Sequence, residues 1–140
     1  RARAERRPIA WIRHHNRPHE SPAFRPGTWG AELSPGCGPE DGHGPETLIE
    51  KDVFGAFTGS GLESWLREHG VDAVLIVGFY AHMCVSTTTR EALVRDFAVA
   101  LDPKVVWREI HHAGWRSRLF ELKVGNDSTR ALIKGARAGL

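Results

Sequence analysis

The sequence predicts an α/β fold: a three-layer, Rossmann-like domain with a doubly wound, mostly parallel sheet. Residues 71–79 are almost continuously apolar, which is typical of a parallel strand with both faces covered. Strand-like and helix-like segments also alternate along residues 47–102 with short connections, and this order winds a parallel sheet. With 140 residues, the chain has the length of a single domain, 1–140.

The first half of the chain predicts two strands and a helix. An apolar, partly β-branched segment at 8–14 and a second at 47–54 are the strand candidates. Residues 60–70 predict an amphipathic helix, with Ser60 as its cap and Gly70 as its stop. Its apolar face is formed by Leu62, Trp65 and Leu66. Three further elements are expected after it: a strand at 71–79, a helix at 84–97 and a strand at 98–102.

A long segment rich in proline and glycine, residues 15–46, separates the first two strands. Irregular loops of this length inside a compact domain are usually lids or binding loops. A disordered linker is the alternative.

Charge and composition exclude several classes of protein. The formal net charge is +2, from 19 basic and 17 acidic residues that are interspersed, so no nucleic-acid partner is predicted. The basic segment 1–7 is interpreted as a solvated helix end. No apolar run has the length of a membrane span and no signal peptide is visible, so a cytoplasmic protein without a membrane partner is expected. Cys37 and Cys84 are too few for a disulfide framework, and reduced thiols are expected.

Cys84 is the first candidate for chemistry. It follows the predicted strand 71–79 and begins the predicted helix 84–97, so it lies at the carboxyl edge of the sheet, where ligands bind. Unpaired N–H groups and the positive end of the helix dipole favour a thiolate there. The alternative is a small buried residue that only fills the core.

Lys51 is the second candidate because it closes the neighbouring apolar segment and precedes a glycine-rich stretch. At the same edge of the sheet, its charge would further stabilise a thiolate. The alternative is an ordinary solvated lysine at a strand end.

Two spacings together resemble the isochorismatase-like cysteine hydrolases, a family that includes nicotinamidases, N-carbamoylsarcosine amidases and ureidoacrylate amidohydrolases. The family's lysine motif is matched by Lys51, Phe54, Ala56, Phe57, Gly59, Ser60 and Leu62. Its cysteine motif is matched by Gly78, Cys84, Val85, Thr88, Arg90 and Ala92. Residues 24–33 resemble the loop beside the family's substrate pocket. The resemblance extends over about 8–102, and the tail 103–140 diverges.

The resemblance implies a mechanism. Cys84 would attack an amide or ureido carbonyl of a small molecule, ammonia or an amine would leave, and water would release the acid from a thioester. Lys51 would be the second catalytic residue. The N–H groups of Tyr80 and Cys84 would form the oxyanion hole, beside a cis peptide bond between Phe79 and Tyr80.

The substrate pocket is expected to be lined by Phe57, Trp29 and His82. Trp29 lies in the long loop, where packing as an anchor is an equal alternative. For His82 the alternative is a histidine held by local hydrogen bonds.

The family's triad also contains an aspartate on the first strand, and the resemblance implies that the sequence starts after this strand. Asp52 directly follows Lys51, and successive strand residues point to opposite faces, while Asp72 lies at the far end of its strand from Cys84. Activity therefore stays open. The predicted function is hydrolysis of a C–N bond. The alternatives are an inactive remnant with a binding or oligomer-contact role and vinyl-ether hydrolysis of the isochorismatase type.

No metal or cofactor is predicted. The eight histidines, among them His14, His15, His111 and His112, raise the question of zinc, but zinc needs ligands that regular spacing or a fixed fold brings together. Because the family commonly forms dimers or tetramers, a homo-oligomer is expected.

Overall fold

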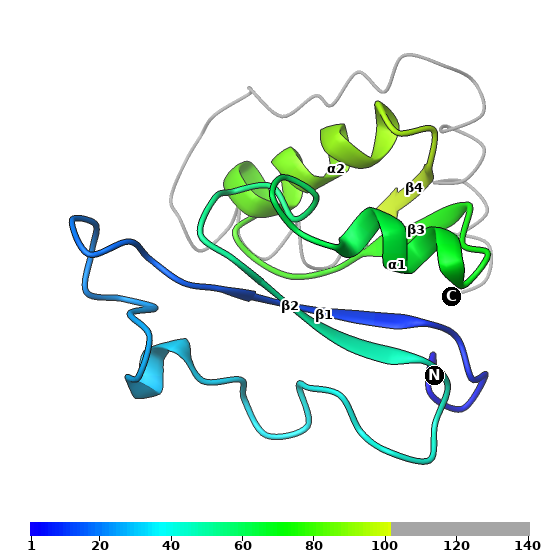
Figure 1. The fold of residues 1–140 in the computed structure, drawn as a ribbon, viewed down its shortest axis with the longest axis horizontal. Helices are drawn as coiled ribbons and strands as arrows, with labels where there is room; N and C mark the ends of the chain where they lie inside the picture. The colour runs from blue at the N-terminus through cyan, green and yellow to red at the C-terminus, as the bar shows by residue number, and fades with distance from the viewer. Residues whose placement is uncertain (102–140) are drawn as a thin grey trace. The chain divides into compact units, whose positions relative to one another are not determined.

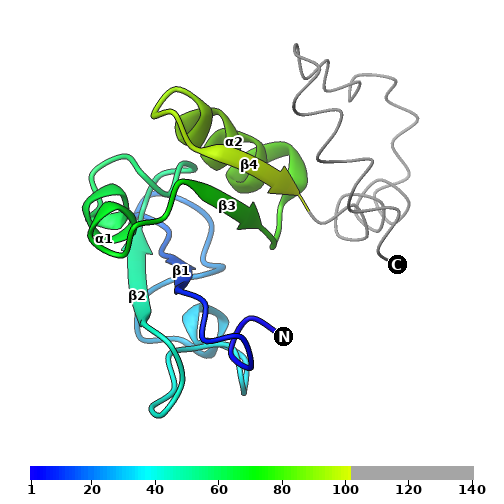
Figure 2. The same cartoon turned by 90° about the vertical axis from the view of Figure 1, so that its right-hand side faces the viewer.

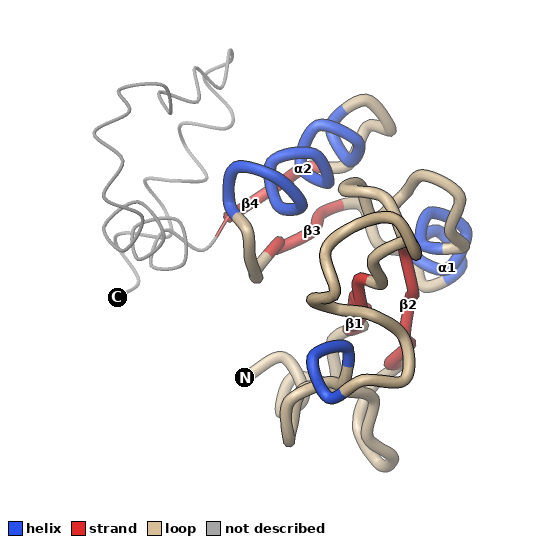
Figure 3. Tube along the Cα trace, turned by 90° about the vertical axis from the view of Figure 1, so that its left-hand side faces the viewer, coloured by secondary structure: helices blue, strands red, loops and turns tan. Residues whose placement is uncertain are grey.

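The structure is a computed structural model that describes residues 1–101. By their internal contacts, these residues belong to two compact units, Arg1–Val71 and a second unit that begins at Asp72. Each unit contains one pair of strands (Figure 3), and both pairs are parallel. The predicted α/β class with parallel strands is therefore confirmed. The predicted tail 103–140 lies outside the described residues.

The first unit is built on two parallel strands, β1 (Ile9–His14) and β2 (Glu46–Lys51) (Figure 1). In this register Ile9 lies opposite Glu46, and His14 lies opposite Lys51. β1 confirms the strand predicted at 8–14. β2 ends earlier than the predicted limit of 54, because the chain bends at Asp52 and the Lys51 ammonium binds the Val53 carbonyl.

A partly buried ion pair holds the start of β2. The Glu46 carboxylate, 3% exposed, accepts hydrogen bonds from Arg3 Nε at 2.8 Å and Trp11 Nε1 at 2.8 Å. Arg3 also lies over the Trp11 ring, 5.2 Å from its centroid. Hydrogen bonds from Arg3 first, and then from Trp11, lower the Glu46 pKa to about 2. Arg3 therefore anchors the basic segment 1–7, whose other residues are exposed, as expected of a solvated segment.

The segment between β1 and β2 is irregular, as predicted, apart from one 3-10 turn, η1 (Trp29–Ala31). Its return to β2 passes close to the N-terminal turn. A side chain at Gly44 would collide with the Arg6 carbonyl, so only glycine fits there.

The helix α1 (Leu62–Glu68) follows β2 and buries Leu62 and Leu66, each burial stabilising the fold by roughly 1.5–3 kcal/mol. Ser60 Oγ accepts the Leu62 N–H at 3.2 Å, so Ser60 satisfies the helix start although Gly61 is the N-cap residue. The predicted stop at Gly70 is confirmed by its φ of 65°.

The second unit is a parallel β-α-β unit. β3 (Ala73–Ile76) pairs with β4 (Ala98–Leu101), and the crossover contains a π-helical turn, η2 (Ala81–Val85), continued by α2 (Ser86–Leu93) (Figure 2). α2 contacts β4.

The core of this unit contains Val85, Ala92, Phe97 and Val99. The Thr89 hydroxyl is also buried and donates to the Val85 carbonyl at 2.8 Å. A polar group inside the helix is thereby satisfied.

Four expectations for the second unit need correction. β3 ends at Ile76 rather than 79, and Leu75 is 67% exposed, so its two faces are not both covered. The helical segment begins at Ala81, before the predicted start at 84. It ends at Leu93 rather than 97, because Asp96 adopts a φ of 61° and reverses the chain.

Within the described residues, no helix is both long and apolar enough to cross a membrane.

Candidate active site

Lys51 is the last residue of β2, and it is buried, with 8% of its surface exposed. Its Nζ donates a hydrogen bond to the Val53 carbonyl at 2.9 Å and lies 3.2 Å from Nδ1 of His14. A strand-ending lysine normally extends its ammonium into water. In this structure the ammonium is instead fixed by directed partners, which excludes the solvated alternative.

His14 ends β1 directly opposite Lys51, and its ring is held from two sides. Nε2 lies 2.9 Å from Oδ1 of Asn16, while Nδ1 faces the Lys51 ammonium. A ring that donates from Nε2 and accepts at Nδ1 is the neutral imidazole. Burial first, and then the Lys51 charge, lower the His14 pKa below its ordinary value of 6.5.

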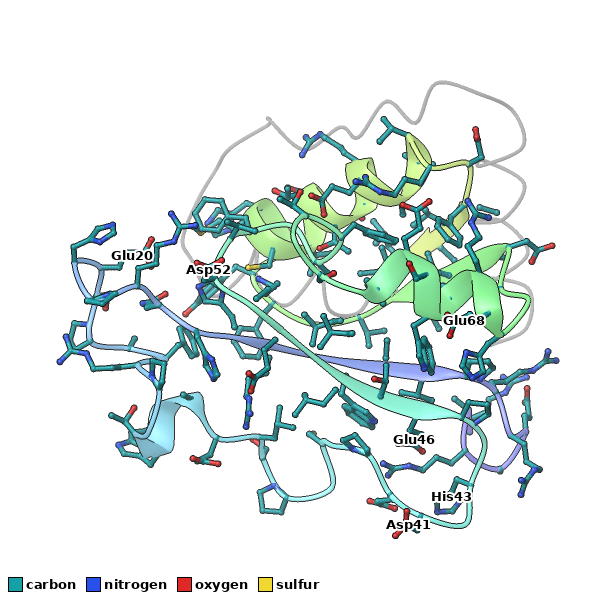
Figure 4. All side chains as sticks on the ribbon, in the orientation of Figure 1. Glu20, Asp41, His43, Glu46, Asp52 and Glu68 are labelled. Carbon is teal, nitrogen blue, oxygen red and sulfur yellow. The ribbon has the colours of Figure 1, made fainter. Side chains whose placement is uncertain are left out.

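Asp52 follows Lys51 directly but pairs with a different partner. Its carboxylate is exposed and binds Arg17 Nε at 2.9 Å, and this hydrogen bond lowers the Asp52 pKa. Asp52 and Glu46 lie at opposite ends of β2 (Figure 4). Asp72 precedes β3 and is also exposed.

Cys84 lies in the first helical turn after β3, within η2, and its side chain is partly exposed. This turn is anchored by the Tyr80 carbonyl, which accepts hydrogen bonds from the N–H groups of Met83 at 3.1 Å and Val85 at 3.2 Å. Cys37, in the irregular segment of the first unit, is exposed. Both are thiols rather than partners in a disulfide.

The segment before Cys84 is backbone of unusual geometry. Gly78 has a φ of 135°, a conformation that side chains rarely adopt, and the peptide bond between Phe79 and Tyr80 is cis. The Tyr80 ring contacts Phe79, with centroids 5.5 Å apart, and lies 6.0 Å from the His82 ring.

The three residues expected in the substrate pocket have different surroundings. Phe57 is buried in the first unit, Trp29 in η1 is 90% exposed, and His82 is exposed. The exposure of Trp29 does not agree with packing as a loop anchor. Their roles toward a substrate stay predictions.

Sequence reasoning missed His14, which it considered only as a zinc ligand. The available signal was topological. His14 ends one predicted strand and Lys51 lies in the second half of the next, and parallel neighbours bring their carboxyl ends to the same edge.

Two spacings in the sequence are of the kind found at metal sites, His15-x-x-x-His19 and Asp41-x-His43. These lie in the irregular segment, where such spacings do not place side chains on one helix face. In residues 1–101, no three His, Cys, Asp or Glu side chains form a group able to hold a metal ion. His111 and His112 lie outside this range.

The chain is similar in sequence to curated proteins. A secreted isochorismatase effector of Verticillium dahliae is 34% identical over 97 residues, which are 69% of this chain and 49% of the effector. An N-carbamoylsarcosine amidase of Arthrobacter is 33% identical over 67 residues, 48% of this chain and 24% of the amidase. The chain spans half or less of the length of these two relatives.

Solved structures show the same fold. An isochorismatase from Pseudomonas putida superposes with a TM-score of 0.66 and 32% identity, covering 74% of this chain and 51% of that protein. The N-carbamoylsarcosine amidase of Thermoplasma acidophilum superposes with a TM-score of 0.65 over 81% of this chain and 72% of the amidase, at 23% identity. Residues 1–109, most of the chain, match the family model described as the isochorismatase domain. The chain therefore belongs to the isochorismatase family.

Proposed function

We propose that the protein is a cysteine hydrolase that cleaves a C–N bond of a small amide or ureido compound. The Cys84 thiolate attacks the carbonyl carbon, the C–N bond breaks, and ammonia or an amine leaves after taking up a proton. Water then cleaves the thioester, which releases the carboxylic or carbamic acid and regenerates the thiol.

The burial of Lys51 is the observation that carries this proposal. A buried ammonium costs desolvation energy, and proteins retain such groups where the charge performs a task. In the proposal, this charge stabilises the thiolate of Cys84. The position of Cys84 in the first turn of a helical segment supports the same role.

The oxyanion of the tetrahedral intermediate is assigned to the N–H groups of Tyr80 and Cys84. Donors of this kind commonly contribute about 3–4 kcal/mol to the transition state. The proton carrier is not assigned to Asp52, because its carboxylate binds Arg17. Phe57, Trp29 and His82 are proposed to contact the substrate.

The names of relatives indicate which substrates to test. They include a nicotinamidase of Arabidopsis thaliana and a ureidoacrylate amidohydrolase of Acinetobacter baylyi, and both names describe hydrolysis of a C–N bond. The Verticillium effector is named an isochorismatase, so vinyl-ether cleavage is the second candidate.

The test measures ammonia release from nicotinamide, N-carbamoylsarcosine and ureidoacrylate, and pyruvate release from isochorismate. Cys84→Ser should abolish the reaction, and Cys37→Ser, the matched control, should leave it unchanged. Mass spectrometry of the protein quenched during turnover should show an acyl group on the peptide that contains Cys84. Turnover that survives in Cys84→Ser would refute the proposal, and pyruvate release alone would replace it with the second candidate.

A further inference from the structure

We infer that His14 is a positioning residue that holds the Lys51 ammonium through its neutral Nδ1 and makes this hold dependent on pH. The inference rests on the proposed function only in the role that it gives to Lys51. The pairing of the two side chains is a feature of the structure in its own right.

The hydrogen bond between Lys51 and His14 can have only one direction, from the ammonium to the ring nitrogen. An ammonium only donates, so at 3.2 Å from Lys51 Nζ the His14 Nδ1 atom must accept. The Val53 carbonyl, at 2.9 Å, is a second acceptor for the same ammonium. These two acceptors lie on different segments, the end of β1 and the bend after β2, and together they fix where the charge sits.

The hydrogen bonds of Asn16 fix the tautomer of the His14 ring. Asn16 Nδ2 donates to the Ser21 carbonyl at 3.0 Å, so the amide oxygen Oδ1 faces His14 Nε2 at 2.9 Å. Because this oxygen only accepts, the ring proton belongs on Nε2 and the lone pair on Nδ1. Asn16 itself is held by its backbone N–H, which donates to the Phe24 carbonyl at 3.1 Å.

The charges around His14 come from the end of β2 and from the segment after β1. Lys51 and His15 disfavour a second positive charge, and Glu20 favours it. The Asp52 carboxylate also interacts with His14 but is bound to Arg17. The Phe24 ring, whose centroid is 6.1 Å from that of His14, adds no charge.

Protonation of His14 would break the pair. A proton on Nδ1 turns the only acceptor that His14 offers to Lys51 into a donor and places two positive charges in contact. His14 would then no longer hold the Lys51 ammonium. The expected result is an acid limb in any reaction that needs Lys51, with its midpoint at the titration of His14.

Two substitutions of His14 separate its role as a hydrogen-bond acceptor from the effect of its protonation. Asn offers an amide oxygen at the place of Nδ1 and does not titrate, whereas Gln extends its amide to the place of Nε2 and leaves Nδ1 unreplaced. His14→Gln should lower the hydrolysis rate by about a hundredfold, a loss typical of a misplaced catalytic group. His14→Asn should recover most of this loss and should shift the acid limb to lower pH. His19→Asn is the matched control: His19 is exposed and is not among the groups that act on His14, so its acid limb should coincide with that of the unchanged protein.

A second measurement does not depend on hydrolysis. Nitrogen-15 NMR of the histidine rings in the full chain should show His14 protonated at Nε2 and titrating below pH 6.5. Lys51→Met removes the neighbouring charge and should raise this midpoint. A His14 titration that is unchanged in Lys51→Met, or a ring protonated at Nδ1, would overturn the inference whether or not the protein is an enzyme.

The two measurements also separate the two ideas. If the NMR results hold and none of the substrates is cleaved, the pairing stands and the proposed function is the part that fails. If hydrolysis occurs and His14→Asn has the acid limb of the unchanged protein, the pH control by His14 is wrong.

Discussion

At the scale of single residues, the chemistry depends on how each group is held. Lys51 ends a strand, as many lysines do, but its ammonium is buried between His14 and the Val53 carbonyl. Cys84 follows a strand and lies in the first turn of a helical segment. Both residues are ordinary in composition, and their placement is what makes them candidates for catalysis.

The first prediction compares the two thiols. Cys84 should react with iodoacetamide about tenfold faster than Cys37 at neutral pH, although Cys37 is the more exposed, because helix N-terminal groups favour the thiolate. Peptide mass spectrometry of folded protein after short exposure measures both rates. Faster modification of Cys37 would contradict the assignment of the nucleophile.

The second prediction concerns the charge of Lys51. Lys51→Met keeps the aliphatic stem and removes the ammonium, so alkylation of Cys84 should slow by about tenfold while Cys37 keeps its rate. Circular dichroism checks that the variant is folded. Equal Cys84 rates in both proteins would show that the Lys51 charge does not act on this thiol.

At the scale of elements, the helices end by the same hydrogen-bond pattern with different residues. After α1, the N–H groups of Gly70 and Val71 donate to the carbonyls of Arg67 and Leu66. After α2, Asp96 and Phe97 make the equivalent bonds. Both Gly70 and Asp96 have a positive φ, near 65° and 61°, which is free of strain only for glycine.

The third prediction follows from this pair of helix ends. Gly70→Ala should lower the free energy of unfolding by about 1 kcal/mol, because a Cβ is disfavoured at this φ. Gly61→Ala is the matched control. Gly61 has a φ of −84° and open space around it, so its substitution should cost less than that of Gly70, although glycine is preferred over alanine at an N-cap. Urea titrations measure both, and a larger loss in Gly61→Ala would refute the argument.

The fourth prediction concerns the start of β2. Glu46→Gln breaks the partly buried pair with Arg3 and should lower the melting temperature clearly at neutral pH. Glu50→Gln removes a half-exposed carboxylate that pairs with Arg13, and its effect should be small. Differential scanning calorimetry compares the two, and equal losses would mean that burial of the Arg3 pair contributes nothing extra.

At the scale of the whole molecule, stability should depend on pH in two windows. His14 has a lowered pKa, so the unfolded chain binds more protons, and its contribution is present above about pH 6.5 and is lost as the pH falls further. Glu46 contributes above about pH 4.5, and this contribution is lost as the pH falls toward 2.

The fifth prediction assigns these windows. The free energy of unfolding, measured by urea titration between pH 8 and pH 3, should fall in two steps on acidification. His14→Asn should remove the step below pH 6.5, and Glu46→Gln should make the step below pH 4.5 smaller, since Asp52 and Glu50 also have lowered pKa values. Stability that rises on acidification through either window would contradict the sign of the corresponding shift.

The sequence by itself determined much of the local structure. Apolar segments at 8–14 and 47–54 predicted β1 and β2, and Gly70 marked the end of α1, because glycine is the residue that tolerates a positive φ. The motifs around Lys51 and Cys84 carried the family resemblance that the family model confirms. Each of these features depends on residues that are close together in the sequence, so it can be predicted from the sequence alone.

Only the tertiary structure decided what depends on partners distant in the chain. The helix end at Asp96 is a local exception, missed because an aspartate at positive φ carries no glycine signal. The anchoring of Arg3 by Glu46 joins residues 43 positions apart. The pairing of His14 with Lys51 exists because parallel register brings two strand ends together and burial removes the water that would otherwise solvate both groups.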